Sequence, residues 1–268
     1  QTCSIDPHTV VNYIVYLMNK HKPSNVVSIY FISMFCFSMK YVPFSDHERI
    51  ISDYGDLVVR HAALNSDVHI QAISRYLRVG GAETFPCPIK LAKAFLDMSY
   101  TSIQYIGKLV AYLISAHQTE ISIVYWEWVD KTEIKDEKIF VQILSDVCSI
   151  GNICIGPQDV MKRTSDLCLK LCCKENQFSV IESSLTALKW FVKNKIIEPT
   201  FPIDYPQPSL ASIAICCYAA YIEYGDIGKL PELPYSDDTS IQRALSQIIL
   251  SASKNPDFRK LNIKSPIW

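Results

Sequence analysis

The chain has 268 residues, of which 49% are apolar and 20% are charged. This composition excludes a disordered chain and is sufficient for one large domain or two small ones with a substantial core. The 26 basic and 27 acidic residues give a net charge of −1, so no global field draws the protein to nucleic acid or to an anionic membrane. A nucleic-acid role is therefore disfavoured, although the net charge does not exclude a local basic patch.

The positions of the ten cysteines indicate free thiols rather than a disulfide framework. Cys172 and Cys173 are adjacent, as are Cys216 and Cys217, and each pair lies within an apolar run that is typical of a helix. We therefore predict a reduced compartment, the cytoplasm or the nucleus. Cys168 lies four residues before Cys172, but no histidine is near them and no CxxC motif occurs, so zinc is not expected.

Two helices are predicted at the start of the chain. Asp6 can cap the first, and Pro7 occupies a position that proline favours. Residues 24–41 form the second and are apolar nearly all round, which predicts a central buried element. A strand over 29–37 is the alternative, because β-branched and aromatic residues are dense there. The apolar run is too short for a membrane span, which needs about 20 residues.

Further helices are predicted where apolar residues recur at helical spacing. Ser45 and Glu48 fit a capping box that opens the third helix, and Gly80-Gly81 indicates a helix end. The segment 118–130 also alternates like a strand, but an isolated strand would lack a pairing partner. We expect helices over residues 67–77, 86–98, 101–116, 118–130, 139–147, 158–173, 178–195, 210–221 and 238–252.

Four prolines between residues 198 and 209 exclude a helix there and predict an extended strap or an internal boundary. The last residues form a basic tail that ends on Ile267 and Trp268, an end suited to docking on the same domain or on a neighbour. We predict a helical-hairpin array, a proline-rich strap, a C-terminal helical pair and an extended tail. Their ranges are 1–197, 198–209, 210–253 and 254–268.

The helices recur as pairs with a regular period. Pair starts near Asp6, Ser45, Pro86, Glu133 and Gln177 are 39, 41, 47 and 44 residues apart. This period resembles that of HEAT and armadillo-type solenoids, although no residue motif of either family is present. The predicted fold is therefore all-α, built of antiparallel helical hairpins, with an irregular α-helical globule as the alternative.

Catalytic motifs are missing from the sequence, which contains no GxSxG, P-loop, GxGxxG, HExxH or zinc-deaminase pattern. Cys87, between Pro86 and Pro88, is expected to be the most exposed cysteine and to have a lowered pKa at a helix start, but no histidine base is evident. His61 and His69 are expected to be surface or capping residues. We predict no enzymatic activity and no cofactor or metal.

Other polar and aromatic clusters are expected to have structural roles. The acidic and basic residues of the run 130–138 are predicted to form solvated pairs four residues apart. Tyr125, Trp126 and Trp128 could anchor a partner, but aromatic residues at such density are more typical of a core.

Two weak clusters remain as candidate binding sites. A phosphate or RNA groove would use the basic residues Arg60, Arg75, Arg78, Lys90, Lys93, Lys162 and Arg163. An oligomerisation arm would use the apolar tail residues Phe258, Ile263, Ile267 and Trp268.

The leading functional hypothesis is a non-enzymatic scaffold that binds a protein partner through a helical-repeat surface. The alternative is a viral nucleoprotein or coat subunit that oligomerises through its terminal arm and binds single-stranded RNA. Neither hypothesis includes a membrane-spanning segment.

Overall fold

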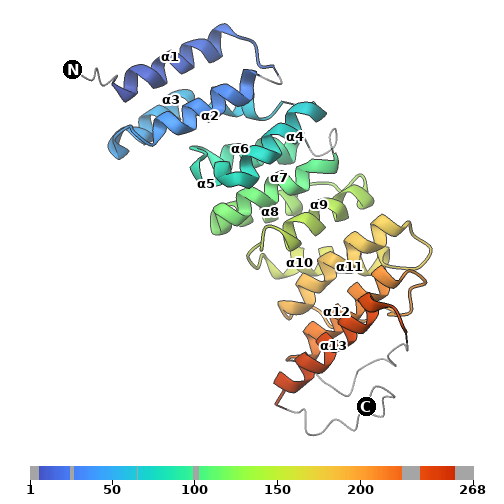
Figure 1. Cartoon of the computed structure of the whole chain (residues 1–268). Helices are drawn as coiled ribbons and strands as arrows, with labels where there is room; N and C mark the ends of the chain where they lie inside the picture. The colour runs from blue at the N-terminus through green and yellow to red at the C-terminus, as the bar shows by residue number, and fades with distance from the viewer. Residues whose placement is uncertain (1–5, 25–26, 65, 99–102, 225–235, 257–268) are drawn as a thin grey trace. The chain divides into compact units, whose positions relative to one another are not determined.

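The computed structural model describes residues 6–24, 27–64, 66–98, 103–224 and 236–256 (Figure 1). Every regular element within these ranges is helical, which confirms the all-α prediction. Among the same residues, no helix has the length and apolar character that crossing a bilayer requires. The chain divides into two units: residues 1–132 with 150–154, and residues 133–149 with 155–268.

The first unit consists of helices joined by short turns. In it α2 packs against α1, α3 and α4, while α6, α7 and α8 pack against one another. Its helices are α1 (Pro7–Lys20), α2 (Val27–Met39), α3 (Phe44–Ala62), α4 (Asp67–Tyr76), α5 (Ala82–Thr84), α6 (Pro88–Asp97), α7 (Ile103–Ala116) and α8 (Gln118–Lys131). The segment 118–130, for which a strand was the alternative, is thus helical.

The predicted start of α1 is confirmed, whereas the predicted start of α3 is wrong. The Asp6 carboxylate accepts a hydrogen bond from the Thr9 backbone N–H at 3.0 Å, and Pro7 is the first helical residue. At α3 the extended Pro43 precedes the helix, and its carbonyl accepts from the Asp46 N–H at 2.9 Å. Ser45 therefore already lies inside the helix, where it cannot act as the cap.

The glycine pair ends α4 as the sequence indicates. After Tyr76 the chain forms a wide turn, Leu77–Gly81, in which Gly80 has a φ of +103°. Only glycine adopts this φ without strain. A Cβ on Gly81 would lie 2.5 Å from the Tyr76 ring, so the two glycines permit a close turn between α4 and α5.

The second unit is built around α11. This helix packs against α9, α10 and α12, and α12 also packs against α13. Leu185, Leu188 and Phe191 of α11 are fully buried. The helices of the unit are α9 (Glu137–Ser149), α10 (Gln158–Leu171), α11 (Phe178–Lys193), α12 (Pro208–Ile222) and α13 (Thr239–Lys254).

Residues 198–207 of the proline-rich segment are not helical, as predicted, and the side chains of residues 199–206 alternate between inside and outside. The predicted end of the strap at residue 209 is wrong, because Pro208 and Ser209 are the first residues of α12, where proline is favoured. Residues 199, 201, 203 and 205 are buried, whereas 200, 202, 204 and 206 are exposed. The Tyr205 hydroxyl donates to the Cys172 carbonyl, and the Tyr218 hydroxyl donates to the Phe201 carbonyl at 2.8 Å. The segment is therefore an extended strap that is fixed along one edge. The other domain limits predicted from the sequence stay predictions.

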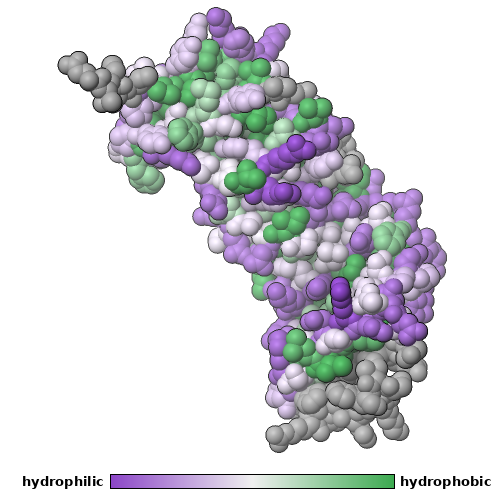
Figure 2. All heavy atoms as spheres, viewed as in Figure 1, coloured by the Kyte–Doolittle hydropathy of each residue, from purple (hydrophilic) through white to green (hydrophobic). Residues whose placement is uncertain are grey.

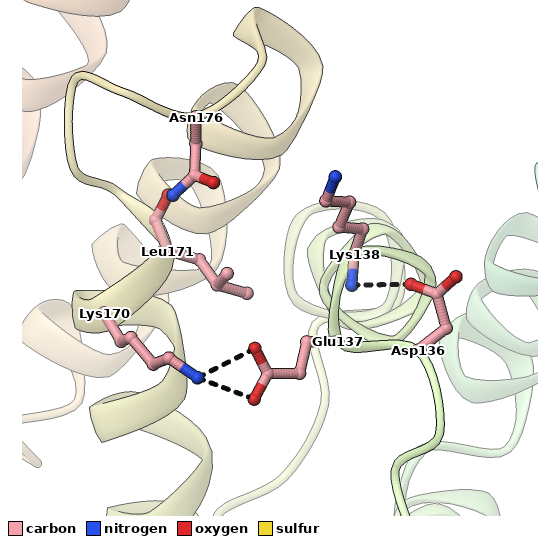
Figure 3. Close-up of polar contacts among 6 residues, drawn as sticks. All are labelled: Asp136, Glu137, Lys138, Lys170, Leu171 and Asn176. Atoms are coloured by element: carbon pink, nitrogen blue, oxygen red, sulfur yellow. Dashed lines mark hydrogen bonds and ion pairs between the residues drawn. The ribbon is translucent and has the colours of Figure 1, made fainter.

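Figure 3 shows how the start of α9 is joined to α10. The Asp136 carboxylate caps α9 by accepting from the Lys138 N–H at 3.0 Å. Glu137 belongs to the run 130–138, for which solvated local pairs were predicted, but it binds the Lys170 ammonium at 2.9 and 3.0 Å. The prediction fails at Glu137 because α10 brings a lysine from a distant part of the sequence to this carboxylate.

Candidate binding surface on the first helical hairpin

Helix α2 is buried on one face and exposed on the other, so the prediction of burial on all sides is wrong. Phe31, Ile32 and Phe35 lie inside the unit. On the opposite face four apolar side chains of α2 follow one another at steps of three, four and three residues, and a fifth follows four residues later in the turn after Met39. They are Val27, Tyr30, Met34, Phe37 and Tyr41, which are 41%, 66%, 47%, 59% and 61% exposed. We call these five residues the apolar stripe.

The area of this surface is large for a single chain. If each aromatic side chain offers about 200 Å², the stripe together with Phe44, which is 88% exposed, presents about 700 Å² of accessible surface. The largest apolar patch on a typical monomer measures about 300 to 600 Å². Figure 2 shows apolar residues, in green, gathered over the α1–α2 end of the first unit.

A hollow lies along the C-terminal half of the stripe. Its volume is about 350 Å³, and its walls come from both helices of the hairpin. Pro7 and Val10 of α1 form one side, and Met34, Phe37, Ser38 and Tyr41 form the other. The Phe37 and Tyr41 rings contact each other edge to face, with centroids 5.2 Å apart. Ser38 is the one polar side chain in the lining, so the hollow suits an apolar or aromatic group.

A buried polar chain holds the hairpin against α3. The His61 Nε2 lies 3.1 Å from the Met18 carbonyl, and its Nδ1 lies 2.9 Å from the Ser28 hydroxyl. A carbonyl can only accept, so Nε2 carries the proton and Nδ1 accepts from Ser28. Burial lowers the pKa of His61, which keeps the ring neutral. One side chain of α3 thereby joins α1 and α2.

His61 and His69 were predicted to be surface or capping residues, and the surface placement is wrong, whereas His69 does bind the carbonyl of Ala62, the last residue of α3. Both side chains are buried, and the His69 Nε2 lies 2.9 Å from the Ala62 carbonyl. Each ring satisfies a backbone carbonyl inside the unit, which is why a polar residue can be buried at these positions. Ser28 and His61 have the spacing of a nucleophile and its base, but both are enclosed by the three helices and have no access to a substrate.

Cys87 also differs from its prediction. It precedes α6, but its side chain is buried and its Sγ lies 3.7 Å from the Gly55 carbonyl. Burial raises the pKa of the thiol to about 12, which is opposite to the expected lowering. A Cβ on Gly55 would lie 3.7 Å from the Cys87 Sγ, so α3 and the start of α6 are in van der Waals contact here. The thiol is therefore inert.

The aromatic cluster of α8 belongs to the core, as predicted. Tyr125 and Trp126 are buried, and the Trp126 indole N–H donates to the Cys154 carbonyl at 2.8 Å. This hydrogen bond and the one from the Cys154 N–H to the Ser122 hydroxyl fix residues 150–154 against α8. The cluster is therefore a structural anchor and not the exposed site.

All seven residues of the predicted basic groove are exposed. Five of them lie in the first unit, whereas Lys162 and Arg163 lie on α10 of the second. The Lys90 ammonium binds the Asp56 carboxylate at 2.7 Å and, with its charge, lowers the pKa of Asp56. The groove therefore stays a prediction. The predicted arm residues Phe258, Ile263, Ile267 and Trp268 lie outside the described residues.

The metal and cysteine chemistry of the described residues adds no further site. No three His, Cys, Asp or Glu side chains in this part of the chain are grouped so that they could hold a metal ion. Its nine cysteines are free.

Comparison of the chain with protein-family models, with curated proteins and with solved structures finds no match. The apolar stripe and its hollow are thus the best-formed candidate site.

Sequence reasoning missed the stripe although its spacing is present in the sequence. Every position of α2 is apolar or a small polar residue, so the 3-4 pattern is hidden among equally apolar neighbours. Tyr41, Pro43 and Phe44, which follow α2 and are exposed, were a weaker signal of the same kind.

Proposed function

We propose that this protein is a non-enzymatic α-helical scaffold that binds a protein partner through the apolar stripe on α2. The observation that carries the proposal is the exposure of four apolar side chains along one face of α2 and of Tyr41 in the turn after it. Contact of such a surface with water is unfavourable, and covering it with another protein removes that cost. Apolar areas of this size are typical of protein interaction sites.

The helical architecture supports the same function. Within each unit consecutive helices pack on one another, as α1, α2 and α3 do in the first unit and α11, α12 and α13 in the second. Together with the period of 39 to 47 residues, this packing favours stacked hairpins that resemble HEAT and armadillo-type arrays. Proteins of that architecture commonly bind other proteins along their exposed helices.

The shape of the surface favours a protein over a small ligand. From Val27 to Phe37 the stripe spans ten residue steps, which corresponds to about 15 Å along the axis of α2, and Tyr41 extends it into the following turn. A small molecule in the hollow beside Met34, Phe37 and Tyr41 would leave Val27 and Tyr30 exposed. An amphipathic helix of a partner would cover the whole stripe.

Affinity capture from cell extract with quantitative mass spectrometry tests the proposal. Full-length protein is compared with Tyr30→Asp, in the stripe, and with Val68→Asp, which changes a 64% exposed apolar residue on α4 outside it. We expect at least one protein to bind the wild type and Val68→Asp but not Tyr30→Asp. An untagged copy of the chain itself counts as such a protein. Equal binding to all three proteins would refute the scaffold proposal.

The nucleoprotein or coat-subunit alternative makes a different prediction. A subunit that binds single-stranded RNA through the seven exposed basic residues would purify with a raised ratio of 260 to 280 nm absorbance. It would also bind labelled poly(U) with an affinity that falls steeply as salt rises. A scaffold would bind its partner through apolar contacts, with little dependence on salt.

A further inference from the structure

We infer that the apolar stripe binds the same stripe of a second copy of this chain, with the two α2 helices antiparallel about a two-fold axis at Met34. This inference rests on the proposed function, since it names the protein that occupies the stripe. It makes the molecule a symmetric dimer whose contact is formed by the first hairpin.

The spacing of the stripe is suited to pairing with itself. Steps of three and four residues make a straight seam on a helix, as in a coiled coil. Met34 lies at the centre of the stripe, with Val27 and Tyr41 seven residues away on either side. In an antiparallel pair Met34 therefore meets Met34 of the second copy, Val27 meets its Tyr41, and Tyr30 meets its Phe37.

The hollow in the hairpin fits this register. It lies beside Met34, Phe37 and Tyr41, the half of the stripe that faces Val27 and Tyr30 of the second copy. Tyr30, the most exposed residue of the stripe, thus projects into the hollow of the other chain. The contact is made twice, once in each direction, because the pair is symmetric.

The area is that of a stable dimer. Each copy contributes about 700 Å² from the stripe and Phe44, so a pair covers about 1,400 Å², against about 1,200 to 2,000 Å² in specific protein interfaces. Most of this area is aromatic, and aromatic side chains are enriched among residues that dominate binding. A helix face of this kind needs no further element to form the contact.

The lack of charge on α2 is compatible with contact between two copies. Helix α2 contains no charged residue between Val27 and Met39, so two copies can meet without burying like charges.

Sedimentation equilibrium of the full chain from about 1 to about 200 μM measures the association directly. We expect a monomer–dimer equilibrium in which Met34→Asp raises Kd by about 100-fold or more, because it places two carboxylates at the axis. Tyr30→Ala should also weaken the dimer, since it empties the hollow. The control Val68→Asp should change Kd by less than about twofold. Met34 is half exposed, so circular dichroism of each variant should match the wild type.

Cysteine cross-linking tests the axis. In Met34→Cys the two introduced thiols face each other, so mild oxidation should form a covalent dimer on a non-reducing gel. Val68→Cys offers an exposed thiol outside the stripe. This variant and the wild type should both run at the mass of a single chain on the same gel, because neither places two thiols at the axis. A dimer that forms in solution but gives no Met34→Cys cross-link would overturn the antiparallel register.

The outcomes separate this inference from the proposed function. A wild-type chain that stays monomeric overturns the second-copy inference, while the capture experiment with Tyr30→Asp still decides whether another protein uses the stripe. A dimer that survives Met34→Asp but is lost in a full-length Ile267→Asp/Trp268→Asp variant also overturns it, in favour of the terminal arm. A dimer lost in Met34→Asp and kept in the tail variant supports it.

Discussion

Replacement of His61 by alanine should destabilise the first helical hairpin more than other single changes in its polar residues. The variant removes the hydrogen bonds to the Met18 carbonyl and from the Ser28 hydroxyl, and leaves both groups buried. It also removes the contact between the imidazole and the Phe31 ring, whose centroids are 6.0 Å apart. Two unsatisfied buried groups and a cavity together cost about 3 to 5 kcal/mol.

Such a loss is a large fraction of the free energy of unfolding of a typical domain, about 5 to 15 kcal/mol. The chain has two units, so unfolding must be followed in the first one alone. Pulsed hydrogen exchange with mass spectrometry, after equilibration in urea, reports on peptides from α1 to α3 separately. His21→Ala removes an exposed histidine at the end of α1 and should cost less than about 0.5 kcal/mol.

The same residue should make the stability of the hairpin depend on pH. Burial lowers the pKa of His61 from its ordinary value of 6.5, so the unfolded chain takes up a proton below pH 6.5 that the folded chain does not. The contribution of His61 to the free energy of unfolding of the hairpin is therefore complete above pH 6.5. It falls by up to about 1.4 kcal/mol per pH unit as the pH drops toward the lowered pKa.

Two results would refute this reasoning about His61. One is a His61→Ala variant whose hairpin unfolds within about 1 kcal/mol of the wild type. The other is a wild-type hairpin whose acid destabilisation between pH 7.5 and 5.5 is unchanged in the variant. Either would mean that the buried histidine does not join α1, α2 and α3 energetically.

Three further predictions concern turns, the strap and the thiols. Gly81→Ala should lower the stability of the first unit by about 2 kcal/mol, because its Cβ would collide with the Tyr76 ring, and urea denaturation measures the change. Tyr205→Phe should destabilise the second unit by about 1 to 2 kcal/mol through the lost hydrogen bond of the strap, seen as faster exchange of strap amides and contradicted by unchanged protection. Exposed Cys173 should react with a thiol reagent well before buried Cys87, whose pKa is raised to about 12; mass spectrometry of labelled peptides would expose the reverse order.

Sequence reasoning located the helices because their signals are local. Asp6 caps α1 through its own neighbour at Thr9, and Gly80 ends α4 because its backbone has a positive φ. Pro199, Pro202 and Pro206 lack the N–H that a helix interior needs, whereas Pro208 begins α12 at a position where that N–H is not needed. Such signals act within a few residues, so they predict the elements whatever the elements later pack against.

The sequence failed where the outcome depends on residues far along the chain. Cys87 is buried because the start of α6 packs against α3 at Gly55, and Glu137 meets Lys170 because α10 passes the start of α9. The helix-start position of Cys87 indicated a reactive thiol, but desolvation by α3 outweighs the local dipole. Local patterns contain no information about these neighbours.

The sequence by itself determined that the chain is all-α and that α2 is apolar over its whole length. Only the tertiary structure decided which face of α2 remains in contact with water. A helix without charged residues has no preferred buried side, so the choice depends on where α1, α3 and α4 contact it. Those contacts cover Phe35 and leave the stripe centred on Met34 exposed, and the candidate binding surface is the result.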